Sequence, residues 1–167
     1  MKRFALALAL ALTVPVVAQA EPPKTDQALD LQKAEVDFAK DKHKAVDKLA
    51  QQWHKDSEKG NPTAETEKEL KVYYKEELAW LRDVGIPTVE DEPLPDHPQH
   101  PDKTPPEPVE DREKLIELRD LMVELKNMSG KEKPKPYGNK LDEFVKILLD
   151  RYERKDKAYE KAKEAAK

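Results

Sequence analysis

The sequence predicts an all-α protein in which four helices form two antiparallel hairpins, packed as a four-helix bundle. In four segments, apolar residues recur at spacings near three, four and seven, the period of helices with one buried face. Between the second and third segments, residues 85–109 hold eight of the fourteen prolines. Because proline lacks a backbone N–H and fixes φ, this crossover can be neither helix nor central strand. Two loosely coupled hairpins are the alternative, since so long an unstructured loop is unusual in a compact domain.

Residues 1–20 have the form of a secretory signal peptide. Lys2 and Arg3 precede an apolar run over residues 4–17, and the small-residue cleavage pattern Ala18-Gln19-Ala20 follows. The run is shorter than the roughly 20 residues that span a bilayer. We therefore expect export to the periplasm or the medium, cleavage after Ala20, and a mature chain without a transmembrane segment.

The mature chain, residues 21–167, is expected to be a single helical domain stabilised by packing alone, because it contains no cysteine. It carries 29 basic and 35 acidic residues, a net charge of −6, and residues 85–111 alone sum to −7. The helices are therefore nearly balanced in charge. A nucleic-acid-binding protein would carry a one-sided basic surface, so we expect no nucleic-acid partner.

The first predicted hairpin covers residues 26–84. Its turn is predicted by Lys59-Gly60-Asn61-Pro62, in which glycine suits the left-handed residue after a helix, asparagine caps the next helix and proline takes its first position. The second helix is expected to end at Gly85-Ile86-Pro87. The predicted buried stripe of the first helix consists of Leu31, Phe38, Ala45, Leu49 and Trp53.

The second predicted hairpin covers residues 110–167. Its first helix should end near Ser129-Gly130 and carries the richest apolar stripe. Two prolines within residues 131–138 predict a loop there, so that Asn139 caps the last helix, with Asp142 three residues later. The stripe of the third helix consists of Leu115, Leu118, Met122 and Leu125.

The sequence lacks the common catalytic motifs. Its two serines, Ser57 and Ser129, do not lie in G-x-S-x-G, and there is no cysteine nucleophile. A Gly-rich phosphate loop, H-E-x-x-H and an EF-hand loop are also absent. We therefore expect no enzyme activity and assign no catalytic residue.

The crossover contains one candidate metal site. Asp96, His97, His100 and Asp102 place four ligands within seven residues, and imidazole with carboxylate suits zinc, copper or nickel. The alternative is a solvated loop in which these groups are only polar. We expect no cofactor, with a divalent transition metal as the alternative.

Two groups of residues are candidates for partner binding. Tyr73, Tyr74 and Trp80 belong to the second helix, and tyrosine and tryptophan are enriched at interfaces, although the same side chains suit a hairpin core. Adjacent residues of a helix point about 100° apart, so one of the two tyrosines is expected at the surface. The second group is the acidic run Glu90, Asp91 and Glu92 in the crossover, which is suited to a basic partner.

These observations favour an exported, non-enzymatic helical protein that binds another macromolecule, as a chaperone, an inhibitor or an immunity-type protein does. Its expected partner is another protein of the envelope. Metal binding or buffering by the crossover is one alternative. A spacer or assembly component of the envelope, with oligomer contacts made by the last helix, is another.

Overall fold

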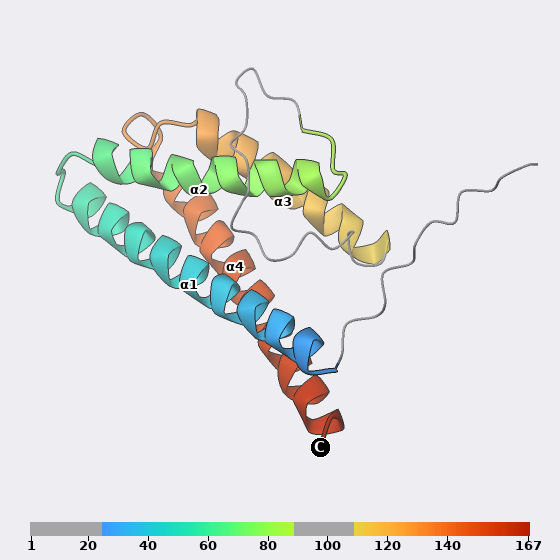
Figure 1. Ribbon diagram of the computed structural model, residues 1–167. Coiled ribbons are helices and arrows are strands. Elements are labelled where there is room, and N and C mark those ends of the chain that lie inside the picture. Colours follow the sequence, from blue (N-terminus) through green and yellow to red (C-terminus); the bar gives the residue numbers. More distant parts are fainter. Residues whose placement is uncertain (1–24, 89–108) are drawn as a thin grey trace, which may run out of the picture.

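The computed structural model describes residues 25–88 and 109–167, which form four α-helices (Figure 1). These are α1 (Thr25–Glu58), α2 (Ala64–Asp83), α3 (Val109–Asn127) and α4 (Pro134–Ala165). The two described ranges contain no strand, so the predicted all-α class is confirmed. Within them, none of the helices is both long and apolar enough to cross a membrane. The predicted signal peptide and residues 89–108 of the crossover lie outside the described residues.

The helices form two antiparallel pairs, α1 with α4 and α2 with α3, which lie against each other as two layers (Figure 1). Glu35 near the start of α1 is paired with Lys155 near the end of α4, whereas His54 near the end of α1 is paired with Asp142. Each predicted hairpin is present, but its two helices contact each other less than these pairs do. Helix length explains this, because α1 and α4 have 34 and 32 residues while α2 and α3 have 20 and 19.

The buried face of α1 differs from the predicted stripe. Leu31 is 50% exposed and Phe38 is only partly buried, whereas Trp53 is buried as predicted. The buried positions of α1 are Val36, Ala39, Lys42, Val46, Ala50 and Trp53. Apart from Lys42 and Trp53, these are alanines and valines, whose small size lets α1 pack closely against its neighbours. Gly138 on α4 serves the same purpose, because a Cβ atom there would lie 3.1 Å from the Trp53 ring.

The buried face of α3 agrees with the prediction, since Leu118, Met122 and Leu125 are buried. Leu115 is partly buried and packs against the same core. The third predicted helix is therefore confirmed as a main contributor to the core.

Two helices begin at other residues than predicted. Helix α4 begins at Pro134 rather than at Asn139, so Asn139 lies inside the helix and does not cap it. Prolines are tolerated in a first turn because the backbone N–H groups there have no partner within the helix. Helix α2 begins after Thr63, not after Asn61. The predicted turn itself is confirmed, with Gly60 at a φ of 69°.

The end of α2 is held against α3 before the crossover begins. Gly85 has a φ of 86°, and the N–H of Ile86 donates to the carbonyl of Leu81, as in a common helix-ending motif. Ile86 is 1% exposed. From α3, the guanidinium groups of Arg112 and Arg119 donate to the carbonyls of Gly85 and Pro87. The first residues of the crossover are therefore fixed by both apolar burial and charged donors.

A pair of buried tyrosines connects the two layers. Tyr74 of α2 and Tyr137 of α4 are completely buried, and their hydroxyl oxygens are 3.1 Å apart. The ring of Tyr74 also meets the ring of Phe144 edge-on, with centroids 5.6 Å apart. Burial raises the pKa of Tyr137 to about 12 and also raises the pKa of Tyr74, because a phenolate would lose its hydration in the core.

We predict that the folded protein loses stability as the pH rises above about 10. Tyrosine in the unfolded chain ionises near that pH, while the raised pKa values keep Tyr74 and Tyr137 protonated in the folded protein. Their stabilisation is thus fully present below pH 10 and is lost as the pH rises toward the folded-state pKa. Each tyrosine should lower the free energy of unfolding by about 1.4 kcal/mol per pH unit in this range.

Urea unfolding at several pH values between about 9 and 11.5 measures this dependence. Tyr137→Phe should flatten it, because the variant lacks one of the two buried phenol groups. The same pH dependence in the parent protein and in Tyr137→Phe would contradict the prediction.

Candidate functional site

The structure separates the three aromatic candidates on α2. Tyr74 is completely buried, whereas Tyr73 and Trp80 are partly buried. The two adjacent tyrosines are not both fully buried, as helix geometry predicts, and Tyr73 is the more accessible of the two, although it also packs against the core. Tyr74 falls on the same face as Leu70 and Leu81, both buried, and so belongs to the core. We therefore remove Tyr74 from the partner-binding candidates, because a partner cannot reach it while the fold is intact.

The exposed side of α2 adds an apolar residue that the sequence did not single out. Val72 is 54% exposed, and within the described ranges only Leu31 is a comparably exposed large hydrophobic residue. Val72, Tyr73 and Trp80 fall within about 100° around the helix, and we call these three residues the α2 strip. The carboxylates of Glu69 and Glu76 lie beside the strip, and Lys68 and Lys75 lie on the other side of Val72. Partial burial, followed by these two carboxylates, raises the pKa of Tyr73.

A buried ionic cluster lies beside the strip and consists of Glu77 of α2, Lys42 of α1 and Arg151 of α4. Glu77 is 0% exposed, and both of its carboxylate oxygens accept from Arg151 Nη1, at 3.1 and 3.0 Å. Lys42 Nζ lies 2.6 Å from Glu77 Oε1 without hydrogen-bond alignment, so that their attraction is chiefly one of charge. The Arg151 guanidinium also lies over the Trp80 ring, 4.6 Å from its centroid. This arrangement, which we call the Glu77 cluster, joins three helices from both layers.

In the Glu77 cluster, a buried negative charge is paired with two positive charges, and each of these charges would be very costly to bury alone. Buried ionisable groups also gather at functional sites, so the cluster is a natural place to look for chemistry. The Glu77 carboxylate pairs with Lys42 of α1 and Arg151 of α4, and Lys42 Nζ also lies 3.7 Å from a carboxylate oxygen of Glu76. This geometry indicates a structural role in holding the two layers together. The Arg151 guanidinium of the cluster also packs on the Trp80 ring.

A second buried carboxylate, Glu67, lies near the start of α2. It accepts hydrogen bonds from Trp53 Nε1 at 3.1 Å, Thr63 Oγ1 at 2.7 Å and the Gly130 backbone N–H at 3.3 Å. A Cβ atom at Gly130 would lie 2.5 Å from Glu67 Oε1, so only glycine allows the α3–α4 connection to come this close. Glu67 thus ties the end of α1, the start of α2 and that connection together.

Sequence reasoning missed both buried acids, although a signal for them exists. Acids in so charged a chain mostly lie on solvated helix faces, so neither residue stands out from its many neighbours. Yet Glu67, Leu70 and Tyr74 follow helical spacing on one face, and Glu77 and Leu81 continue it. An acid at an apolar position of the period is therefore the signal that could have found them.

The remaining predicted site residues lie outside the described ranges. These are the acidic candidates Glu90, Asp91 and Glu92 and the metal candidates Asp96, His97, His100 and Asp102. The structure therefore does not test the predicted acidic binding segment or the predicted metal site, and both stay predictions. Among the residues that the structure describes, no group of three or more histidines and acids is placed to hold a metal ion.

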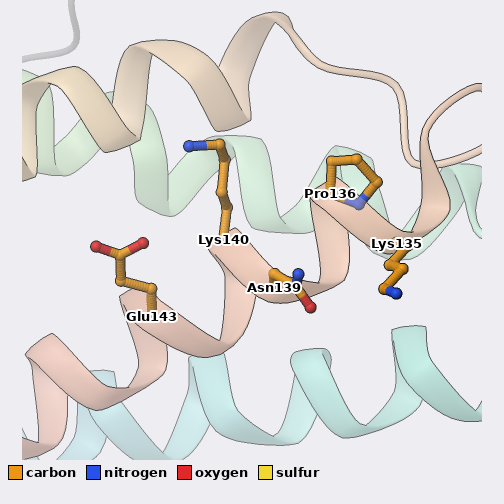
Figure 2. A pocket seen from close by; sticks show the side chains of 5 residues that line it. All are labelled: Lys135, Pro136, Asn139, Lys140 and Glu143. Atoms are coloured by element: carbon orange, nitrogen blue, oxygen red, sulfur yellow. The ribbon is translucent and has the colours of Figure 1, made fainter.

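A surface depression on α4 offers no further chemistry (Figure 2). All of its lining residues come from the first turns of that one helix, and Lys140 reaches α3, where it pairs with Glu124. The residues that line it are Lys135, Pro136, Asn139, Lys140 and Glu143. Exposed lysines and one acid on a single helix form neither a nucleophile with its base nor an enclosed binding site.

Comparison of the chain with models of protein families, with curated proteins and with solved structures finds no match.

We predict that Arg151 contributes more to stability than Lys42 does. Arg151→Met removes two charge-assisted hydrogen bonds and the stacking on Trp80, and should lower the free energy of unfolding by about 3 kcal/mol. Lys42→Met keeps the Glu77–Arg151 pair and exchanges an unaligned ammonium for an apolar chain, so the loss should be about 1 kcal/mol or less. Urea unfolding, followed by circular dichroism, measures both. A larger loss for Lys42→Met would show that we have assigned the wrong principal partner to Glu77.

Proposed function

We propose that the protein is exported with cleavage after Ala20 and acts, without catalysis, by binding another macromolecule of the cell envelope. The form of residues 1–20 supports export, and the lack of catalytic motifs in the sequence supports a binding role. The α2 strip is the surface that we assign to the partner.

The observation that carries this proposal is the exposure of Val72 beside Tyr73 on a helix whose opposite face is fully packed. Tyrosine and tryptophan are enriched at the centre of interfaces, and the exposed valine adds apolar area beside them. Both signs of charge border these side chains, with Glu69 and Glu76 on one side of Val72 and Lys68 and Lys75 on the other. A matching partner surface would therefore be apolar at its centre and mixed in charge at its rim. Trp80 is held in position by Arg151 and extends the strip along α2.

The test begins with the mature protein, tagged at its C-terminus and purified from its native envelope fraction. N-terminal sequencing should find Glu21 as the first residue, and mass spectrometry should identify a stoichiometric partner. Binding of the purified partner is then measured for Val72→Ser combined with Tyr73→Ser. We expect affinity to fall at least about tenfold, which corresponds to about 1.4 kcal/mol.

The matched control combines Gln51→Ser with Gln52→Ser, because these adjacent residues are exposed on α1 away from the strip. Its affinity should equal that of the parent protein. The proposal would be overturned if no stoichiometric partner is found, or if the two double variants bind the partner equally well.

A further inference from the structure

Both connections between the two layers lie at the same end of the molecule (Figure 1). Residues 59–63 join α1 to α2, and residues 128–133 join α3 to α4. The hydrogen bond from the Gly130 N–H to Glu67 brings the second connection to the start of α2, next to the first. The crossover joins α2 to α3, which are two helices of the same layer. Within residues 25–88 and 109–167, no chain connection between the layers is placed at the end where α2 stops.

Toward that other end, the layers are connected by charge. Glu77 lies ten residues beyond Glu67 on α2, or about 15 Å further along the helix axis. Its partners Lys42 and Arg151 both belong to the opposite layer. Between the two acids lies the apolar contact of Tyr74 with Phe144 and Tyr137.

We propose that the α2–α3 pair opens away from the α1–α4 pair about the two connections, with the Glu77 cluster as the latch. Packing within each pair is more extensive than packing between α1 and α2 or between α3 and α4, so each pair can move as a unit. The latch is suited to opening because its three charged groups regain hydration when they separate, which offsets the lost pairing. Gly60 suits the pivot, since its φ of 69° is accessible to glycine and its Cβ direction is open.

Opening uncovers the inner faces of the two layers, including Tyr74 and the two residues that it contacts across the layers, Tyr137 and Phe144. This surface is apolar and distinct from the α2 strip. The inference does not depend on the proposed function, because it concerns a motion of the chain alone.

The absence of cysteine from the chain allows a direct test by thiol labelling of single-cysteine variants. Leu78→Cys places a thiol at a completely buried position of α2, one turn beyond Tyr74, whose ring meets Phe144 of α4. Ala39→Cys is the control, because it is buried on α1 outside the main core cluster. Labelling rates are measured without urea and at urea concentrations below the unfolding transition. The free energy of the opening that exposes Leu78→Cys should depend on urea much less steeply than that of global unfolding, whereas Ala39→Cys should be labelled only through global unfolding. Equal urea dependence at both sites, matching that of global unfolding, would overturn the proposal.

The latch is tested by Glu77→Gln, with Glu69→Gln, at an exposed acid of the same helix, as its control. Glu77→Gln should speed labelling of Leu78→Cys at least about tenfold and leave that of Ala39→Cys unchanged, whereas Glu69→Gln should change neither. In single-tryptophan versions, iodide should quench Trp80 more strongly in Glu77→Gln, while Trp53 at the connected end stays protected. Equal exposure of both tryptophans, or no change in either, would overturn the role of the cluster. If Glu77→Gln does not fold, the urea dependence of labelling in Leu78→Cys and Ala39→Cys, both with Glu77 intact, still decides whether the layers open.

Discussion

A carboxylate with no exposure to water determines how these helices meet. Glu77 can be buried only where cations reach it, and the two that do so come from α1 and α4. This requirement fixes the rotation of α2 and α4 relative to each other, since Arg151 must point inward at the level of Glu77, and Lys42 of α1 adds a second positive charge at the same level. Apolar contacts alone would tolerate small shifts of α2 along its neighbours, whereas a charged pair at 3 Å does not.

The composition of the chain explains why polar contacts have this role. Charged residues make up 40% of the sequence and hydrophobic ones 37%, which leaves little apolar area for two layers. Aromatic residues and buried acids therefore share the interlayer contact. Where α1 and α4 extend beyond α2 and α3, the contacts are polar again, with Lys155 paired to Glu35 and Lys33 lying 5.8 Å from the Tyr159 ring centroid.

The sequence predicts the four helices because their apolar period is a local property of the chain. It does not predict which helices pair most extensively, since that depends on matching lengths and on faces that meet only in the fold. Proline normally breaks a helix, so the pattern around Pro134 predicted a loop where the structure has a first turn. Helix geometry likewise predicts that two adjacent tyrosines are not both fully buried, but only the packing of the helices decides that Tyr74 is the buried one. Glu77 was hidden among many solvated acids, because its two partners are far away in sequence.

Contacts between α2 and α4 test the layered arrangement most directly, because two loosely coupled hairpins would lack them. We would record nuclear Overhauser effects in the folded, isotope-labelled protein, between the rings of Tyr74 and Phe144 and between the Trp80 ring and the Arg151 side chain. We predict that both sets of cross-peaks are present, since the ring centroids of Tyr74 and Phe144 are 5.6 Å apart and the Arg151 guanidinium lies 4.6 Å from the Trp80 ring centroid. A protein with four intact helices that shows α1–α2 and α3–α4 contacts but neither of these would contradict the arrangement described above.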